Sequence, residues 1–332
     1  MLRICLVGCG FMGRMHANVY KLLDRAQLVA VVDRGERGKK FGEEFGVPDF
    51  ETLEEALKAE SIDAVDICLP TDLHSEFTIQ AARAGRDIFC EKPMARTVAE
   101  ADAMIAACDA EHVRLMIGHC IRFWPEYALV KNIKDEGRLG KLLSINLTRF
   151  GEFPSWSQEN WLGEEKRSGG AALDMHIHDT DFAMYLFGKP TEVASYGTDD
   201  GRGIGQIFTT MRFGDSVAHL EGGWNLPKKT PFKMAFRAIF ENGVAIMDGG
   251  PMQIIEQGKD PETPEFKKMS AAGGGNISDL GGYYLELEYF VNRILDNQPF
   301  EITTPESSRD SLQAVLGEIE QAKSRMGAVA SL

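Results

Sequence analysis

The sequence predicts two domains: an α/β domain built on a doubly wound parallel sheet, followed by an α+β domain with an open-faced, mostly antiparallel sheet. Two observations lead to this prediction. Strand-like and helical patterns alternate strictly through about residue 119, whereas longer strand-like segments of alternating polarity prevail afterwards. A chain of 332 residues is also long enough for two cores. We therefore expect a first domain over residues 1–119 and a second over residues 120–332.

The first domain alternates five apolar segments with four helical patterns. Strands are expected at residues 3–8, 28–33, 62–70, 87–92 and 114–120, and helices at residues 13–23, 37–45, 73–84 and 98–111. Runs such as ICLV and VAVV are apolar throughout, which is typical of strands buried on both faces of a parallel sheet. Strict alternation places helices on both faces of that sheet.

The second domain contains longer strand-like segments with alternating polarity. Strands are expected at residues 142–150, 191–198, 206–213, 216–224, 233–242 and 244–248, and helices at residues 171–187, 283–297 and 306–325. This pattern favours an antiparallel sheet with helices on one face. Whether the last helix packs back on the first domain stays open. Residues 259–282 are rich in glycine, proline and charge, so a mobile loop is expected there.

The composition excludes several classes of protein. Lysine and arginine total 36 against 50 aspartates and glutamates, a net charge of −14, so the basic surface that nucleic-acid binding needs is missing. No apolar run reaches the roughly 18 residues that cross a bilayer. The first residues resemble a strand entering a glycine turn more than a signal peptide. We expect a cytoplasmic protein with neither nucleic acid nor a membrane as partner.

The cysteines favour the same compartment. The sequence has no CxxC pair, and several cysteines lie in strand-like runs, so we expect reduced, partly buried thiols rather than disulfides or a zinc site. The six are Cys5, Cys9, Cys68, Cys90, Cys108 and Cys120.

A GxGxxG motif, GCGFMG, follows the first strand and opens the first helix. Gly8 is expected to allow the tight turn, Gly10 the approach of a pyrophosphate, and Gly13 the packing of helix on strand. Phe11 and Met12 lie between them, where a helix N-terminus would hold the phosphates. The motif alone is weakly specific, and a plain glycine turn is the alternative. Within a strand–turn–helix context it predicts a Rossmann domain.

An acidic residue follows at the expected distance. Asp33 ends the second strand about twenty residues past Gly13, where a carboxylate would bind the adenosine ribose hydroxyls. This favours NAD over NADP, because a 2′-phosphate would be repelled. Arg34 comes next and could receive that phosphate, so NADP stays the less favoured cofactor.

The third strand ends at the edge of the sheet where ligands of open α/β folds bind. Leu69, Pro70, Thr71 and His74 are therefore candidate cofactor contacts. For His74, a polar residue near a helix start is an equally good interpretation.

The fourth strand ends at the same edge with Glu91 and Lys92, both candidate cofactor contacts. Most lysines are solvated surface residues. Lys92, however, terminates an apolar strand beside the expected nicotinamide, and Pro93 restricts its backbone and permits a cis peptide bond. We interpret Lys92 as a catalytic residue.

A second polar group lies in the apolar helical segment SGGAALDMHIHDTDFAMYLFG. Asp174, His178 and Asp181 are spaced i, i+4 and i+7 and share one face. Buried polar groups need partners, which a cleft with a hydroxylated substrate or internal salt bridges would supply. His176 points away from that stripe. The alternative takes His176, His178, Asp179 and Asp181 as metal ligands, but HxH ligands usually lie on strands, so no metal is expected.

On these motifs the sequence resembles the Gfo/Idh/MocA family, named after glucose-fructose oxidoreductase and inositol dehydrogenase. The resemblance covers essentially the whole chain: GCGFMG, PTDLH, AGRDIFCEKP, GHCIRFWPEY, and GGAALDMHIHD with Asp181. It implies that Lys92 lies near nicotinamide and substrate, that Asp174 and His178 form the family's DxxxH dyad, and that the protein is a homodimer or homotetramer. The sequence departs from the family pattern at Ala171, where a glycine is common, and at His176, where a small residue is usual.

The expected function is hydride transfer between NAD and a sugar, sugar derivative or cyclitol, the substrate class resting on the resemblance. His178 would accept the hydroxyl proton, Lys92 would stabilise the developing alkoxide, and Asp174 would orient the imidazole or Lys92. These three residues are also candidate substrate contacts. The alternative is a non-catalytic dinucleotide-binding sensor. Retention of all three acid–base residues argues against a sensor.

Further candidates for lining a polyol site are aromatic or hydrogen-bonding residues, each of which is equally well interpreted as core or interface. Arg122 and Trp161 are the principal ones, and Phe123, Trp156 and Tyr283 are the others.

Overall fold

The computed structural model describes residues 1–155, 157–267 and 280–328, which form two compact units. Unit 1 comprises Met1–Trp124 and Lys267–Arg309, and unit 2 comprises Pro125–Phe266 and Asp310–Leu332. The chain therefore returns to unit 1 after most of unit 2. The division at residue 119 stays a prediction about domains, and most of the predicted mobile loop, residues 268–279, lies outside the described residues.

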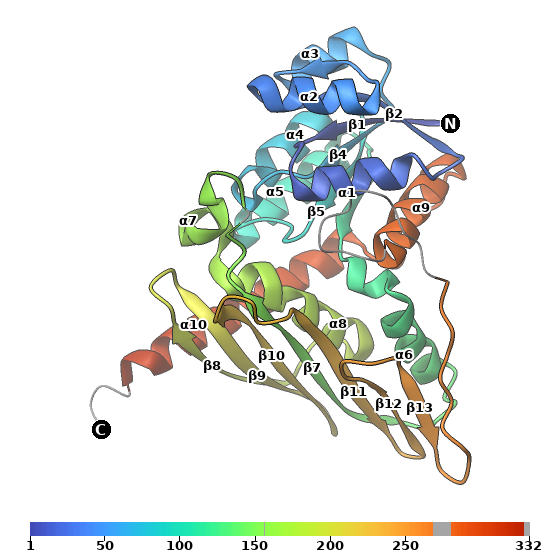
Figure 1. Cartoon of the computed structure of the whole chain (residues 1–332), viewed down its shortest axis with the longest axis vertical. Coiled ribbons are helices and arrows are strands. Elements are labelled where there is room, and N and C mark those ends of the chain that lie inside the picture. Colours follow the sequence, from blue (N-terminus) through green and yellow to red (C-terminus); the bar gives the residue numbers. More distant parts are fainter. Residues whose placement is uncertain (156, 268–279, 329–332) are drawn as a thin grey trace. The chain divides into compact units, whose positions relative to one another are not determined.

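Unit 1 contains the predicted doubly wound parallel sheet (Figure 1). Its six strands lie in the order β3-β2-β1-β4-β5-β6, and every pair is parallel. They are β1 (Leu2–Val7), β2 (Ala26–Val32), β3 (Asp49–Phe50), β4 (Ala64–Ile67), β5 (Asp87–Glu91) and β6 (Leu115–Gly118). The sequence predicted all but β3, which has two residues. This order reverses direction between β1 and β4, the place where such sheets bind ligands.

The helices of unit 1 cover both faces of this sheet. They are α1 (Phe11–Tyr20), α2 (Gly35–Phe45), α3 (Leu53–Ala59), α4 (His74–Arg83), α5 (Val98–Ala110) and α9 (Gly281–Leu295), with short turns η1 (Thr71–Leu73) and η2 (Cys120–Phe123). Helix α5 shows why its boundary was predictable: the Thr97 side chain accepts from Glu100 N, and the Glu100 side chain accepts from Thr97 N. This capping box satisfies backbone donors at the helix start.

The two faces are distinguished by alternate residues of β5. Phe89 packs in one apolar cluster with Val19 of α1 and Phe290 of α9, whereas the neighbouring Cys90 contacts Thr78 of α4. Helices α1 and α9 thus share one face, and α4 covers the other. The apolar residues of α9 thus complete the core of unit 1.

Unit 2 contains a seven-stranded, mostly antiparallel sheet in the order β13-β12-β11-β7-β10-β9-β8. Its strands are β7 (Leu142–Glu152), β8 (Glu192–Asp199), β9 (Ile204–Phe213), β10 (Ser216–Leu226), β11 (Lys233–Phe240), β12 (Gly243–Met247) and β13 (Gln253–Glu256). Only β10 and β7 pair in parallel. Six strands were predicted, and the four-residue β13 was missed.

Helices cover one face of this second sheet, and the other face is open within the described part of unit 2 (Figure 1). The helical segments are α6 (Pro125–Asp135), η3 (Gln158–Gly163), α7 (Glu165–Ser168), η4 (Ala172–His176), α8 (Ile177–Phe187) and α10 (Pro305–Ala328). In the covered face, Ile207 of β9 packs against Ala172 and against Ala322 of α10. The predicted single α-helix 171–187 is wrong in one respect: η4 is a π-helical turn, wider than an α-turn.

Candidate active site

The glycine loop of unit 1 has the geometry that a dinucleotide needs. Gly8 has a φ of +101°, and a Cβ there would lie 2.4 Å from the carbonyl oxygen of Cys68. A Cβ at Gly13 would lie 1.9 Å from the Gly8 carbonyl oxygen, so only glycine lets α1 come this close. A Cβ at Gly10 would meet nothing within 4 Å. The backbone at Gly10 is thus open to a ligand at the start of α1.

Phe11 and Met12, the other two motif residues, form the first turn of α1. Both are half-buried, and Met12 packs against the apolar cluster beneath the helix. The first turn carries no acidic side chain, so it presents a positive helix end without a competing carboxylate.

Asp33 lies at the end of β2, and its carboxylate is 9% exposed. Its Oδ2 accepts the Cys9 main-chain N–H at 2.8 Å, which ties the carboxylate to the glycine loop. Its Oδ1 accepts the main-chain N–H of Arg34 at 2.7 Å. The side-chain cation beside Asp33 is Arg37 of α2, which donates to both oxygens at 2.6 Å. Arg37 was not predicted from the sequence; the predicted cation was Arg34, whose side chain is exposed.

The loop after β4 brings a buried hydroxyl to the same edge of the sheet. Leu69 and Pro70 are half-buried, whereas Thr71 is 2% exposed and its Oγ1 makes no hydrogen bond to the residues the structure describes. A buried hydroxyl without a partner is unusual and fits a ligand atom nearby. With the open Gly10 and the carboxylate of Asp33, these residues fit a dinucleotide.

His74 joins two loops at this edge. Its Nδ1 lies 2.8 Å from the Pro93 carbonyl oxygen and its Nε2 lies 2.8 Å from the Leu69 carbonyl oxygen. Burial lowers the pKa of His74 below its ordinary value, although the two carbonyl hydrogen bonds act in the opposite direction. The ring therefore connects the strand ends, and its predicted cofactor contact remains a prediction.

Lys92 follows the last residue of β5 and is half-buried. Its main-chain N–H donates to Glu91 Oε2 at 3.0 Å. The Lys92–Pro93 peptide bond is cis, as the sequence allowed. Glu91 is 5% exposed and lies on the strand face that carries α1. Lys92 is thus placed at the carboxyl edge of the sheet that also carries the glycine loop.

In unit 2, two glycines lead into the π turn. Gly169 and Gly170 have φ values of +82° and +72°, a conformation that favours glycine. Ala171 has a φ of −58° in the right-handed region, so the third position needs no glycine. This explains why the departure from GGG at Ala171 is tolerated.

The predicted polar stripe divides in the structure. Asp174, in the π turn, and His178, in the first turn of α8, are both half-exposed. Asp181 is fully buried, and its Oδ1 accepts the Ser311 hydroxyl of α10 at 2.8 Å. Asp174 and His178 thus keep some exposed surface, whereas Asp181 is buried and contacts α10.

His176 belongs to a buried network and does not reach the surface of unit 2. Its ring is fully buried, and Nε2 donates to Glu318 Oε2 of α10 at 2.7 Å. The hydroxyls of Thr180 and Thr209 donate to the same carboxylate at 2.9 and 2.7 Å. A Cβ at Gly222 would lie 2.7 Å from His176 Nδ1, so this glycine of β10 makes room for the ring. The departure from the family pattern at His176 therefore serves a structural role inside unit 2.

The alternative metal site in this helix is not supported. Besides His176 and Asp181, Asp179 is also engaged: it is fully buried and accepts a hydrogen bond from Arg149 at 2.9 Å. Three of the four proposed ligands thus already have protein partners.

The candidate lining residues have different positions. Arg122 is 5% exposed and donates to the Ile302 carbonyl oxygen and, at 3.1 Å, to Ser307 Oγ, contacts that favour a structural role. Phe123 is 6% exposed within the core of unit 1. Tyr283 is half-buried in the same core, Trp161 is half-buried in unit 2, and Trp156 lies outside the described residues. Their roles toward a substrate remain predictions.

Sequence reasoning missed a buried polar cluster in unit 1. His16 of α1 lies 2.8 Å from Asp66 of β4 and 3.1 Å from Glu91 of β5. The signal was Asp66, a carboxylate in the middle of an apolar strand, which requires a buried partner.

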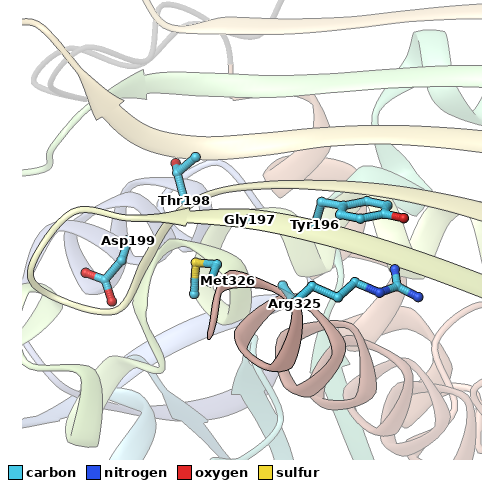
Figure 2. A pocket seen from close by; sticks show the side chains of 7 residues that line it. Tyr196, Gly197, Thr198, Asp199, Arg325 and Met326 are labelled. Atoms are coloured by element: carbon cyan, nitrogen blue, oxygen red, sulfur yellow. The ribbon is translucent and has the colours of Figure 1, made fainter. Parts of the chain in front are cut away.

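A hollow of about 330 Å³ in unit 2 lies apart from the candidate residues (Figure 2). It is lined by the end of β8 and the last turns of α10, with the Arg325 guanidinium 4.6 Å from the ring centre of Tyr196. No predicted site residue lines it.

The open glycine loop, the carboxylate of Asp33 and the buried Thr71 hydroxyl define unit 1 as a dinucleotide-binding domain of the Rossmann class. Residues 2–119 match the family model of an oxidoreductase family with an NAD-binding Rossmann fold, and residues 127–246 match the GFO/IDH/MocA C-terminal domain. The chain belongs to the GFO/IDH/MocA oxidoreductase family, and NAD is the cofactor of its first domain.

Several known proteins are similar to this chain. A 2,7-anhydro-N-acetylneuraminate hydratase of Mediterraneibacter gnavus is 33% identical over 66% of this chain and 60% of the relative. A myo-inositol 2-dehydrogenase of Thermotoga maritima is 34% identical over 58% and 56%. The alignments thus span less than two thirds of either relative. A crystal structure of an oxidoreductase from Agrobacterium radiobacter with NAD+, L-tartaric acid and magnesium has a TM-score of 0.87 at 18% identity, covering 97% and 96% of the two chains.

Proposed function

We propose that this protein is an NAD(H)-dependent oxidoreductase that transfers hydride between nicotinamide and a hydroxyl or carbonyl carbon of a sugar, sugar derivative or cyclitol. The observation that carries the proposal is the position of Lys92, half-buried at the carboxyl edge of the sheet that holds the glycine loop. The substrate class is supported by relatives named for an anhydro sugar and for myo-inositol.

Each residue has a defined task in this proposal. NAD, when bound, supplies a nicotinamide carbon that accepts the hydride. His178 removes the hydroxyl proton of the substrate. Its Nδ1 is buried, so the proton is taken at Nε2. The Lys92 ammonium donates to the same oxygen as negative charge develops, and Asp174 orients the base.

The first experiment is a substrate screen over inositols, hexoses, sugar acids and nucleotide sugars with both NAD and NADP. Absorbance of the reduced cofactor reports net oxidation. Mass spectrometry of the products is measured in parallel, because a hydratase-type reaction adds water and produces no net NADH. A non-catalytic sensor would bind NADH and give no product in either assay, which would refute the proposed function.

The second experiment tests Lys92 itself. We expect Lys92→Met to leave the NADH dissociation constant nearly unchanged and to lower turnover by about 100-fold or more, the typical loss of one donor to a developing oxyanion. Lys58→Met is the matched control, because the Lys58 side chain is 73% exposed and the substitution removes the same charge, together with one surface ion pair to Glu54. Unchanged turnover in Lys92→Met would refute its role.

A double variant tests whether both units act on one substrate. His178→Asn should lower turnover to a similar degree. If Lys92 and His178 serve the same oxygen, the combined loss in Lys92→Met/His178→Asn is smaller than the product of the single losses. Fully multiplicative losses would place the two residues in separate roles.

We also propose a homodimer or homotetramer formed through the open face of the unit 2 sheet. Ile239, Val244 and Ile255 pair in register across β11, β12 and β13 and point to that face, and Ile239 and Ile255 are 37% and 39% exposed. Light scattering of the wild type and of Ile239→Glu tests it: a monomeric wild type would refute it. A cytoplasmic location is proposed from the six free thiols. Within the described residues, no helix is both long enough and apolar enough to cross a bilayer.

A further inference from the structure

We propose that His16 is a positioning residue for Lys92: its imidazole connects the carboxylate of Asp66 to that of Glu91, and Glu91 accepts the main-chain N–H of Lys92. The inference rests on the proposed function, in which Lys92 contacts the substrate. All four residues lie in unit 1, on α1, β4 and the end of β5. The buried imidazole of His16 on α1 thus helps to fix the backbone at the end of β5.

The Asp66 end of the chain of contacts fixes the His16 ring. Both side chains are fully buried. Asp66 Oδ2 accepts from His16 Nδ1 at 2.8 Å and from the Tyr20 hydroxyl at 2.8 Å. The Cys68 thiol lies 3.2 Å from the same ring nitrogen. A carboxylate buried this deeply is costly unless it is paired and hydrogen-bonded, so these contacts hold the ring in one orientation.

Glu91 links the oriented His16 ring to the end of β5. The second ring nitrogen of His16, Nε2, lies 3.1 Å from Glu91 Oε1. The other oxygen of the same carboxylate, Oε2, accepts the N–H of Lys92 at 3.0 Å. The two oxygens of Glu91 therefore face one buried ring and one main-chain group. Without the ring, Glu91 Oε1 would lose its buried ion-pair partner.

Lys92 is also held from its other side. The carbonyl oxygen of Pro93 lies 2.8 Å from Nδ1 of His74, a ring that is 1% exposed. The residue before Lys92 is thus anchored through His16 and the residue after it through His74. Two buried rings from different helices restrict the backbone from which the ammonium extends, which is how a scaffold sets the reach of a catalytic group.

Charge supports the same geometry. Nδ1 of His16 hydrogen-bonds the Asp66 carboxylate, whereas Nε2 lies at ion-pair distance from Glu91 Oε1 without the geometry of a hydrogen bond, so the second contact attracts Glu91 when the ring is the cation. Burial alone would lower the pKa of His16, but Asp66 and Cys68 raise it well above its ordinary value. Burial alone would raise the pKa of Glu91, but His16 and then Lys92 lower it. The Tyr20 hydroxyl donates to Asp66 in the same cluster, and the centre of the Tyr283 ring lies 6.5 Å from that of the His16 ring.

The same cluster also has the donor types of a metal site. Ligand atoms of His16, Asp66 and Cys68 lie within 4.8 Å of one another. Each of these atoms is, however, already in a hydrogen bond with another member of the set. The three side chains therefore satisfy one another as a buried polar network. This network also reaches Lys92 through Glu91, which a buried polar cluster with a purely structural role need not do.

The test uses two neutral variants that each retain a nitrogen at one of the two ring-nitrogen positions of His16. In His16→Asn the amide nitrogen replaces Nδ1 and still reaches Asp66. In His16→Gln it replaces Nε2 and still reaches Glu91. Val19→Ala is the control for lost stability, because it removes fully buried apolar atoms from the same helix. The variants differ in the one contact that the inference concerns.

Four quantities are measured: kcat and KM on a substrate from the screen, the NADH dissociation constant, the melting temperature, and the amide hydrogen exchange of Lys92 by NMR. We expect His16→Asn to lower kcat by about 10-fold or more, the order of loss that misplacement of a catalytic group produces, with KM and NADH binding little changed. Amide exchange at Lys92 should be faster in His16→Asn than in His16→Gln. The His16→Gln variant should also recover much of the kcat that His16→Asn loses. Val19→Ala should retain wild-type kcat.

Equal kcat and equal Lys92 exchange in the two His16 variants would overturn the inference. If His16→Asn fails to fold, Glu91→Gln weakens the same contact from the other side and should also speed exchange at Lys92; unchanged exchange overturns the inference as well. Lys92→Met separates the two proposals. Wild-type turnover in Lys92→Met refutes the proposed function, whereas an inactive Lys92→Met beside fully active His16 variants refutes only the positioning role.

Discussion

Replacing Glu318 by glutamine is expected to destabilise unit 2 by about 3 kcal/mol. The carboxylate is fully buried and accepts three hydrogen bonds, from His176, Thr180 and Thr209, at 2.7 to 2.9 Å. Hydrogen bonds to a charged group contribute roughly 1.5–3 kcal/mol and neutral ones roughly 0.5–1.5. Glutamine retains the shape and loses the charge, so about 1 kcal/mol is lost for each of the three contacts.

Differential scanning calorimetry and urea unfolding measure this loss. At about 2–4 °C per kcal/mol for a unit of this size, the transition assigned to unit 2 should fall by about 6–12 °C. Thr210→Val is the control, because the Thr210 hydroxyl hydrogen-bonds His219 on the exposed face of the same sheet and should cost no more than about 0.5 kcal/mol. A Glu318→Gln protein within about 0.5 kcal/mol of the wild type would refute the idea that this network holds α10 to the sheet.

Three further outcomes are expected. Asp33→Asn should weaken NADH binding about 10-fold or more in a fluorescence titration and reduce discrimination against NADPH; wild-type binding would contradict the ribose contact. Because the folded-state pKa of His16 is raised, its ion pairs stabilise the fold fully below the unfolded value of about 6.5 and are lost as pH rises through the folded value. The stability gap between wild type and His16→Gln should therefore be larger at pH 6 than at pH 9, and a constant gap would count against the imidazolium. Burial raises the pKa of Cys5 and Cys108 to about 12, so a thiol reagent at pH 8 should modify them only after unfolding; rapid native reaction would show that these thiols are accessible.

The architecture of both units was predictable because their longer elements carry strong periodic signals. The apolar runs of β1 and β2 and the capping box at Thr97 are local features that a single sequence displays. The missed strands β3 and β13 have two and four residues, too few for a period to be visible. Helix α9 was predicted as a helix, but its place in unit 1 depends on packing partners more than 150 residues away, which no local pattern encodes.

The candidate site was predictable in its residues and less so in their surroundings. Lys92 and the glycine loop followed from the ends of strands. The stripe Asp174, His178 and Asp181 assumed α-helical spacing, and the π turn breaks that spacing at its start. A π turn has the same residue composition as an α-turn, so only the two glycines before it gave any signal. Asp66 indicated a buried partner, but a distance of fifty residues in sequence hid His16 as that partner.

The return of the chain to unit 1 has a consequence for biosynthesis. On the ribosome, residues 1–124 emerge first, yet the sheet face around Phe89 is completed only by Leu287, Phe290 and Val291 of α9. The nascent amino-terminal segment must therefore wait, with an uncovered apolar surface, while residues 125–280 are translated before α9 begins. During that interval it is a natural client for chaperones, and a gene truncated before α9 should yield an aggregating product rather than a smaller soluble domain.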